Sequence, residues 1–499
     1  MNKKKIAIIG SGFSGLASAA YLAKEGHQVH VYEKNEQLGG RARQFKKEGF
    51  TFDMGPSWYW MPDVMESFFN DFNTSTKDYF ELKELSPAFN IVFGKEDELT
   101  IPSDYGELRR LFESIEPGSS LELDSFMDDA KKKYEISFSK LIEKPGLSIM
   151  EYLEYDTIKQ SLKLNLFSSY QKMVHRKFKH PKLRALMEFP VLFLGAKPKD
   201  TPALYSLMNY AGLKLGTHYP MGGFYALVEA MVSVCRELGV TFHTDSEVTE
   251  LCVQQNKVVS IEINGISNTV DAVIGSADYH HIESKLLNKD YRNYNEKYWS
   301  KKTFAPSSLI FYLGIKKTVK KLNHHTLFFD ADFDLHSTEI YDEKRWPNDP
   351  LFYVCTPSKT DKNVAPEGCE NLFVLMPLAA GLEDTPELRD KYFKILLKRL
   401  ESHLGEQLSD DIVVNESYCI KDFKADYNAY GGNAYGLANT LNQTAIFKPK
   451  MVNKKISNLI YTGQLTVPGP GVPPSLISGK IAANLMLQEL KKKNYEIAL

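Results

Sequence analysis

The sequence has few cysteines, no excess of one charge and no long apolar run. Its cysteines, Cys235, Cys252, Cys355, Cys369 and Cys419, are odd in number and form no CxxC pair, which argues against a disulfide framework or a cysteine metal site. Lys and Arg total 61 against 63 Asp and Glu, whereas proteins that bind nucleic acid usually carry a strongly basic domain. We predict a cytoplasmic protein with reduced thiols and no nucleic-acid partner.

No stretch approaches the roughly 18 apolar residues of a membrane-spanning helix. The N-terminal MNKKKIAIIGSG has basic residues before an apolar run, but a run of about five is too short for a signal peptide. The sequence therefore predicts a protein that is soluble or that lies on a membrane without crossing it. At roughly 150 residues per domain, two or three domains are expected.

A glycine loop stands near the start of the chain. Residues 4–34, KKIAIIGSGFSGLASAAYLAKEGHQVHVYEK, are typical of strand, turn, helix and second strand. Gly10, Gly12 and Gly15 fit GxGxxG: the first permits the turn, the second lets a diphosphate approach, and the third lets helix and strand pack closely. Glu33 ends the second strand, where a carboxylate accepts ribose hydroxyls. Just beyond it, Gly39-Gly40-Arg41 adds a second loop whose arginine can pair with phosphate. These features predict FAD.

A second Gly/Pro-rich loop lies near the other end, in TGQLTVPGPGVPPSLISGK (462–480). Residues 459–462 read as a strand of the same sheet, Gly463 to Gly471 as a loop with bare backbone, and the residues from about Pro474 as a helix. The N-terminus of that helix would point its positive end at the flavin. We predict that both glycine loops enclose one cofactor.

Segments spread over the chain resemble the flavin amine oxidase and carotenoid desaturase superfamily, most closely the bacterial-type phytoene desaturases. They are GSGFSGLASAAYLAKEGHQVHVYEKNEQLGGRAR (10–43), GFTFDMGPSWYWMP (49–62), LFLGAKPKDTPALYSLMNYA (192–211), YPMGGFYALVEAM (219–231), PSKTDKNVAPEGCENLF (357–373) and the C-terminal loop. The resemblance implies an α/β fold: an FAD-binding Rossmann-like domain of the glutathione-reductase/amine-oxidase type, with an inserted mixed α+β substrate domain. Residues 1–70, 215–285 and 450–499 would form the FAD domain, and 71–214 and 286–449 the substrate domain.

The resemblance also extends the cofactor site. It implies that the backbone of Val248 pairs with adenine and that the loop from Gly55 to Ser57 lies near the flavin ring. The complete predicted set is Gly10, Ser11, Gly12, Phe13, Ser14, Gly15, Glu33, Lys34, Gly40, Arg41, Gly55, Pro56, Ser57, Val248, Gly463, Gly471 and Val472. Many amine oxidase relatives have Gly-Asp where this chain has Gly463-Gln464, so the role of the Gln464 side chain stays open.

A basic segment suggests contact with lipid. Arg176, Lys177, Lys179, Lys182 and Arg184 surround Phe178 and precede the apolar FPVLFLG, a pattern that suits an anionic membrane surface but equally a solvated helix face followed by core. The resemblance favours the membrane, because a long polyene reaches an enzyme only through lipid. We expect a membrane-contacting helical part at about 165–215 in a cytoplasmic protein peripheral to the membrane.

The implied reaction is desaturation of phytoene or partly desaturated carotenoids, with hydride transfer to FAD and a quinone or molecular oxygen as final electron acceptor. We predict no catalytic residue: a conjugated polyene stabilises allylic charge, so a weak proton acceptor suffices. Glu188 could accept a proton or be an ordinary core acid, and the cluster from Trp58 to Pro62 could wall a substrate channel or only pack the core. The pairs His280-His281 and His324-His325 would point to opposite faces of a strand, so no metal site is predicted.

Three alternatives stay open. The first is desaturation of another carotenoid, such as the 3,4 bond of a hydroxycarotenoid, and the second is cis–trans isomerisation of a carotenoid by reduced flavin. The third, of a different class, is non-enzymatic isoprenoid binding by a protein resembling the Rab GDP-dissociation inhibitors. The intact Glu33, Gly-Gly-Arg and Gly463-to-Gly471 regions argue against the last.

Overall fold

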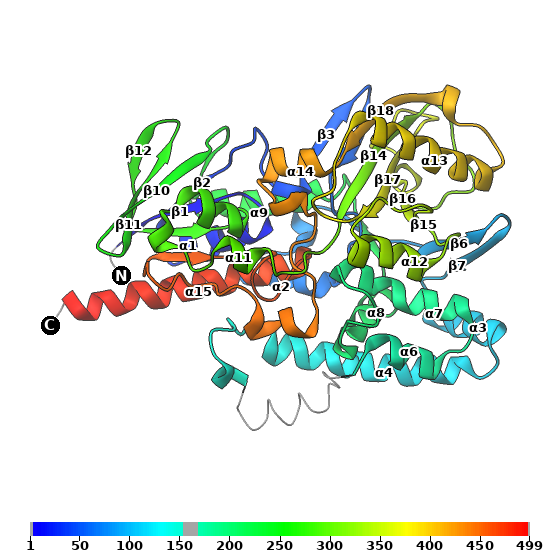
Figure 1. The fold of residues 1–499 in the computed structure, drawn as a ribbon, viewed down its shortest axis with the longest axis horizontal. Coiled ribbons are helices and arrows are strands. Elements are labelled where there is room, and N and C mark those ends of the chain that lie inside the picture. Colours follow the sequence, from blue (N-terminus) through cyan, green and yellow to red (C-terminus); the bar gives the residue numbers. More distant parts are fainter. Residues whose placement is uncertain (1–2, 153–167, 498–499) are drawn as a thin grey trace.

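The fold is built on two large sheets that lie side by side (Figure 1). The computed structural model describes residues 3–152 and 168–497. One sheet has five parallel strands in the order β19-β13-β1-β2-β9. They span Leu459–Tyr461 (β19), Ala272–Gly275 (β13), Lys5–Ile9 (β1), Gln28–Tyr32 (β2) and Thr241–His243 (β9). A strand from the C-terminal region therefore lies two places from β1, as the sequence predicts.

Alternating side chains of β1 pack on different layers, as a central strand requires. Ile6 and Ile8 share a buried cluster with several helices, whereas Ala7 and Ile9 pack toward a three-stranded antiparallel sheet. These helices include α1 (Phe13–Lys24), α9 (Tyr225–Glu237) and α15 (Val472–Ile497). The small sheet comprises β10 (Val248–Gln254), β11 (Lys257–Ile263) and β12 (Ile266–Thr269).

The other large sheet has seven strands in the order β18-β14-β17-β16-β15-β6-β7, and only the pair β15–β6 is parallel. Its strands are β18 (Ile412–Tyr418), β14 (Ser307–Ile315), β17 (Glu370–Leu378), β16 (Phe352–Cys355), β15 (His325–Phe328), β6 (Phe89–Gly94) and β7 (Asp97–Ile101). This mixed sheet beside a parallel one confirms the predicted α/β arrangement.

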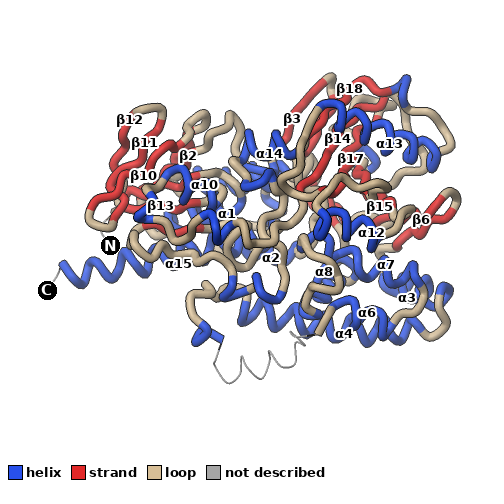
Figure 2. The backbone as a smooth tube through the Cα atoms, in the orientation of Figure 1, coloured by secondary structure: helices blue, strands red, loops and turns tan. Residues whose placement is uncertain are grey.

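Helices cover the two faces of the seven-stranded sheet unequally. On one face, Tyr392, Leu396, Leu400 and Leu404 of α13 (Pro386–Leu404) recur every fourth residue and enter the core. Beyond the other face lies the helical group that Figure 2 shows at the lower right. It consists of α3 (Tyr105–Ile115), α4 (Ser119–Ile136), α6 (Tyr170–Lys177), α7 (Pro181–Glu188) and α8 (Leu207–Leu213). Among the residues described, no helix is both long and apolar enough to cross a membrane.

Short elements join the two parts of the molecule. β3 (Gln44–Lys47) pairs with β4 (Phe50–Asp53), and β5 (Leu82–Glu84) pairs with β8 (His218–Pro220). Helix α2 (Pro62–Asn70) packs on α15, and α12 (Phe333–Thr338) and α14 (Ile420–Tyr427) lie near the junction. In α11 (Glu296–Trp299), Trp299 packs against Tyr279 in the same cluster as β19. We therefore propose that the second segment of the substrate domain, predicted to begin at residue 286, begins near residue 305.

Candidate functional site

A cavity of about 760 Å³ runs between the two large sheets. Sixteen of the 17 residues predicted to hold the cofactor line it, from both glycine loops, the end of β2, the 55–57 loop and the start of α15. The exception is Gly15, which lies behind the first loop. A β-carbon on Gly15 would stand 2.1 Å from the carbonyl oxygen of Gly10, so this glycine serves the close packing of helix and strand.

The first glycine loop leaves space where a ligand is expected. Gly10 adopts φ +95°, which favours glycine, and its N–H donates to the carbonyl of Tyr32 at 2.8 Å. Gly12 precedes the first residue of α1, and a β-carbon there would meet no atom of the described chain within 4 Å. The free N–H groups at the start of α1 therefore face open cavity, the arrangement that binds phosphate.

The second glycine loop faces the first. A β-carbon on Gly40 would lie 3.2 Å from the Cα of Gly12. The N–H of Gly39 contacts Ser11, at 3.1 Å from its Oγ and 3.2 Å from its carbonyl oxygen. The two loops thus approach each other through bare backbone.

Glu33 is almost completely buried at the end of β2, with 4% of its surface exposed. Its Oε2 accepts hydrogen bonds from the N–H of Ser11 (3.1 Å) and from its hydroxyl (2.7 Å). Its Oε1 accepts from the N–H of Asn35 (3.0 Å) and from its side-chain amide (2.9 Å). The carboxylate is therefore held in a fixed orientation at the edge of the cavity.

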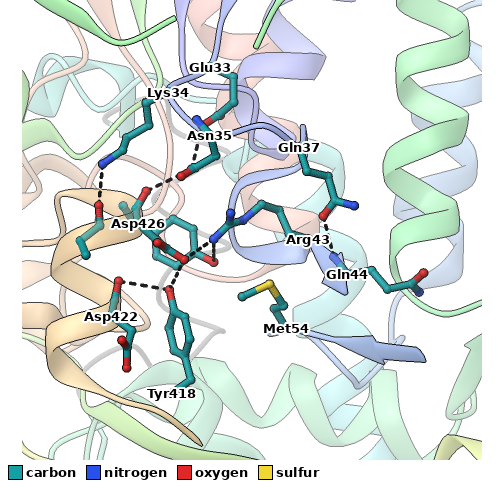
Figure 3. Close-up of polar contacts among 12 residues, drawn as sticks. Glu33, Lys34, Asn35, Gln37, Arg43, Gln44, Met54, Tyr418, Asp422 and Asp426 are labelled. Atoms are coloured by element: carbon teal, nitrogen blue, oxygen red, sulfur yellow. Dashed lines mark hydrogen bonds and ion pairs between the residues drawn. The ribbon is translucent and has the colours of Figure 1, made fainter. Parts of the chain in front are cut away.

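Helix α14 covers this end of the cavity from the opposite part of the chain (Figure 3). Lys34 donates to the carbonyl of Ala425 at 2.5 Å, and the Asn35 amide donates to that of Asp426 at 3.2 Å. The Asp426 carboxylate forms an ion pair with Arg43 and accepts a bond from Tyr418. Residues on both sides of the junction therefore close the cavity together.

Arg41 presents an incompletely satisfied cation to the cavity. Its guanidinium lies 4.9 Å from the ring centre of Tyr427, and one Nη donates to the carbonyl of Asn433 at 3.4 Å. Its Nε is buried without a hydrogen-bond partner in the described chain. Burial lowers the pKa of this guanidinium, an effect opposed by Tyr427 and Asp278. An anionic ligand such as a diphosphate would supply the missing partner.

The C-terminal loop reaches the first glycine loop. A β-carbon on Gly463 (φ +106°) would lie 3.2 Å from Oγ of Ser14. Helix α15 begins at Val472, directly after Gly471, so its N-terminus opens on the cavity. The amide of Gln464 donates to Oδ1 of Asn433 at 3.3 Å. This contact places the side chain whose role the sequence left open.

The remainder of the cavity is lined mostly by apolar side chains. Its wall on the seven-stranded sheet uses residues of four strands, which are Ser308, Ile310, Leu327, Phe352, Tyr353, Leu375 and Pro377. Helical segments add Phe138, Leu141, Phe189, Leu207 and Met208. Of the aromatic cluster, Trp58 and Trp60 line the cavity, whereas Tyr59 is fully buried in the core of the parallel sheet. The cluster thus contributes both to the cavity wall and to the core.

One expectation about the histidine pairs is wrong. His324 and His325 do not point apart, because β15 begins only at His325 and His324 belongs to the preceding turn. Ligand atoms of His324, His325 and Cys355 lie within 4.8 Å of one another, close enough to hold a metal ion. Burial lowers the pKa of His324 to about 3 and raises that of Cys355 to about 12.

The other pair, His280 and His281, lies in a short helix, α10 (Tyr279–His281), rather than a strand. The imidazole rings of His280 and His281 have separate partners. Nε2 of His280 lies 2.9 Å from the carboxylate of Glu296, and Nε2 of His281 lies 3.3 Å from the amide of Asn428.

The basic segment lies on α6, α7 and the turn between them, where Arg176 and Lys179 are exposed. Phe178 is fully buried, Lys177 pairs with Glu122 at 2.9 Å, and Lys182 pairs with Asp97. Residues 165–167 of the predicted membrane-contacting part lie outside the described residues. Glu188 is 6% exposed with Oε1 2.9 Å from Nε2 of His175, and its neighbour Phe189, rather than Glu188, lines the cavity.

The sequence reasoning missed several residues that line the cavity or lie directly behind its wall. Asn433 links Arg41 to Gln464, Asp278 lies beside Arg41, and Tyr353 lies on the apolar wall. Asn433 follows Gly431 and Gly432, both with positive φ. This Gly-Gly-Asn turn was the available signal, because consecutive glycines mark a backbone path closed to other residues.

Known proteins are similar to this chain over nearly its whole length. Residues 13–487 match the family described as flavin containing amine oxidoreductase. A carotenoid 3,4-desaturase of Haloarcula japonica is 39% identical, over 98% of this chain and 99% of the relative. A 4,4'-diapophytoene desaturase (4,4'-diaponeurosporene-forming) of Staphylococcus haemolyticus is 32% identical, over 97% of this chain and 99% of the relative.

Solved structures share the fold at low identity. An oxidoreductase from Methanosarcina mazei superposes with a TM-score of 0.59 at 18% identity, covering 95% of this chain and 99% of that chain. A redesigned putrescine oxidase gives a TM-score of 0.64 at 12% identity, covering 97% of this chain and 99% of that chain.

Proposed function

The chain belongs to the flavin-containing amine oxidoreductase family, and within that family we propose that it is an FAD-dependent carotenoid desaturase. The observation that carries the proposal is one cavity with two unlike halves. Glycine backbone, a helix N-terminus and a buried arginine form one half, and aromatic and aliphatic side chains form the other. A dinucleotide suits the first half and a long polyene the second.

FAD fits the polar half by three observations. Gly12 has open space where a side chain would stand, Gly40 approaches it through bare backbone, and Nε of Arg41 lacks a hydrogen-bond partner in the described residues. We propose that Glu33 holds the adenosine ribose and that Arg41 and the start of α1 hold the diphosphate. The residues from Gly463 to Val472 and the 55–57 loop would hold the flavin. When bound, FAD supplies the acceptor for the hydride that leaves the substrate.

The apolar half sets the substrate class. Its wall of strand residues and aromatic rings offers few polar partners, which suits a hydrocarbon chain. Phytoene or a partly desaturated carotenoid is the proposed substrate. The 3,4 bond of another carotenoid is the second candidate, favoured by the 39% identity to the Haloarcula protein against 32% to the diapophytoene desaturase.

We propose that the substrate enters from a membrane surface, and that a quinone or molecular oxygen reoxidises the flavin. Phe138, Leu141 and Ile142 line the cavity from one segment, and residues 444–447 line it from another. The two segments touch, since a β-carbon on Gly146 would lie 3.3 Å from the carbonyl of Ala445. Both segments lie along the lower edge in Figure 1. Of the nearby large apolar side chains, Met150 is 68% exposed and Phe447 56% exposed. Exposed apolar side chains beside an apolar opening suit contact with lipid.

Product analysis tests this function. The gene is expressed in separate hosts that accumulate phytoene or a carotenoid saturated at its 3,4 bond, and the pigments are identified by mass and absorption. A product two hydrogens lighter and red-shifted from one host identifies the substrate. A product of unchanged mass but altered geometry indicates an isomerase, and purified protein without affinity for FAD indicates a non-enzymatic isoprenoid carrier.

A further inference from the structure

His324, His325 and Cys355 come together behind the apolar wall of the cavity. We propose that these three side chains form a buried binding site for one thiophilic metal ion, zinc or copper(I). None of the three lines the cavity, so the site is independent of the proposed function. A bound ion would tie the start of β15 to the end of β16.

Two neighbouring strands hold the proposed ligands in place. His325 is the first residue of β15 and Cys355 the last of β16, and the two are paired directly in the antiparallel register. Residues paired in this way point to the same face of a sheet. His324 joins them from the turn before β15, with its ring centroid 4.6 Å from that of His325. One ligand atom of each residue lies within 4.8 Å of the others.

Burial keeps both imidazoles in the form that binds metal. His325 is 0% exposed, Cys355 2% and His324 4%. Burial lowers the pKa of His324 to about 3 and holds that of His325 well below its ordinary value, so both rings are neutral near neutral pH. The pKa of the Cys355 thiol is raised by burial. A metal ion would displace the thiol proton, which leaves to solvent as the sulfur–metal bond forms.

The hydrogen bonds of His325 leave a lone pair for coordination. The Tyr353 hydroxyl donates to Oγ of Ser57 at 3.0 Å, so Nδ1 of His325, 2.6 Å from the hydroxyl oxygen, donates to it. The proton of the neutral ring is then on Nδ1, and Nε2 carries the lone pair. The ring of Trp58 stacks on that of His325 with centroids 4.0 Å apart. A ring fixed by an outer partner at one nitrogen is typical of metal-binding histidines.

Both rings leave the same nitrogen unsatisfied. Nδ1 of His324 lies 2.7 Å from Oγ1 of Thr360. Nε2 of His324 and Nε2 of His325 are buried without a hydrogen-bond partner in the part of the chain that the structure describes. Buried polar atoms without partners lower stability. One metal ion would satisfy both nitrogens together.

The spacing and the ligand types suit a soft metal ion. Bonds of about 2.0–2.1 Å to nitrogen and about 2.3 Å to sulfur place ligand atoms roughly 3.3–3.8 Å apart, so atoms now within 4.8 Å would close by at most about 1.5 Å. Thiolate and imidazole select zinc or copper(I), whereas magnesium and calcium prefer oxygen. Thr360, which is half-buried beside His324, gives the ion a path from the surface.

Metal analysis of the full chain, purified without a metal-affinity tag, tests the site. We expect one zinc or copper ion per chain, and X-ray absorption should show one sulfur and two nitrogen neighbours. Cys355→Ser and His325→Gln should lose the metal. Cys235→Ala, which removes a different fully buried thiol, is the matched control and should retain it.

Cobalt(II) binding to the metal-stripped protein separates loss of the site from loss of folding. The wild type should give a thiolate-to-metal charge-transfer band, and Cys355→Ser should lack this band while keeping the wild-type circular dichroism. Thr360→Val removes only the outer partner of His324. It should keep the band but weaken binding by roughly 10- to 100-fold, the usual loss for such a partner.

Wild-type protein that contains no metal and binds neither zinc, copper nor cobalt would overturn the proposal. Metal held with equal affinity by wild type and Cys355→Ser would also overturn it, since the ion would then be bound elsewhere. X-ray absorption of the wild type without a sulfur neighbour has the same meaning, and it requires no variant to fold. The desaturase function is tested separately, by flavin reduction with carotenoid.

Discussion

The hydroxyl of Ser18 donates a hydrogen bond of 3.0 Å to the carbonyl oxygen of Gly479, 461 positions further along the chain. It joins the first helix of the molecule, α1, to the last, α15. At the ends of these two helices the first glycine loop and the C-terminal loop meet, with Gly463 close to Ser14. The cofactor cavity therefore depends on a contact between the two ends of the sequence.

This contact makes Gly479 sensitive to any side chain. A β-carbon there would lie 2.4 Å from the carbonyl of Ser14 and 2.7 Å from Cβ of Ala17. Gly479→Ala must therefore push α15 away from α1, and we expect it to lower the free energy of unfolding by about 1–3 kcal/mol and to weaken FAD binding. Thermal unfolding and FAD titration measure both effects. Gly94→Ala, where a β-carbon meets nothing within 4 Å, is the control.

Substitutions of Gly12 and Gly15 are predicted to affect different properties, FAD affinity and apoprotein stability respectively. A side chain on Gly12 points into open cavity, so Gly12→Ala should leave the apoprotein stable while lowering FAD affinity at least tenfold, or about 1.4 kcal/mol. A β-carbon on Gly15 would collide with Gly10, so Gly15→Ala should lower the melting temperature of the apoprotein itself. Equal effects of the two changes on apoprotein stability would contradict this division.

Arg41 and Arg43 form a matched pair for testing phosphate recognition. Arg41→Met removes a buried cation whose Nε has no partner in the described structure. It should weaken FAD binding by roughly 10- to 100-fold, the range for a charged hydrogen bond of about 1.5–3 kcal/mol, without lowering apoprotein stability. Arg43→Met breaks the ion pair with Asp426 and should lower stability. If Arg41→Met lowered apoprotein stability without weakening FAD binding, Arg41 would have a purely structural role.

Glu188 should make stability depend on pH. Burial raises the pKa of its carboxyl to about 8 and lowers that of His175, so the two groups are neutral in contact near neutral pH. Because the folded protein keeps a proton that the unfolded chain has released, the free energy of unfolding should fall as pH rises from about 4.5 to 8. The loss is a few kcal/mol, at about 1.4 kcal/mol for each pKa unit.

The isosteric variant Glu188→Gln tests this effect. Its melting temperature should change less between pH 5 and pH 8 than that of the wild type, with desaturase activity retained because the residue lies off the cavity wall. A variant with unchanged pH dependence, or one with no activity despite normal folding, would show that the carboxyl has another role.

Local patterns in the sequence predict much of the fold and the glycine-loop half of the site. GxGxxG followed by an acid requires a particular turn, helix start and strand end, and Gly10, Gly12 and Glu33 occupy those places. The C-terminal loop could be assigned because its glycines and prolines leave few backbone paths. Such signals depend on neighbours in sequence.

The other half of the site could not be predicted because it depends on partners distant in sequence. Asn433 gains its role from Arg41 and Gln464, which only folding brings near. The histidines at 324 and 325 were misjudged because the alternation rule holds within a strand, and β15 begins between them. The ion pair of Lys177 with Glu122 joins residues 55 positions apart, so the basic segment alone does not reveal it.

The most direct test of the account is anaerobic mixing of the FAD-loaded protein with a carotenoid in liposomes, followed by absorption spectroscopy. We expect the flavin band to bleach in a single turnover while the polyene bands shift to longer wavelength, one added double bond for each flavin reduced. Protein that binds FAD yet leaves both spectra unchanged with phytoene and with a 3,4-saturated carotenoid would contradict it.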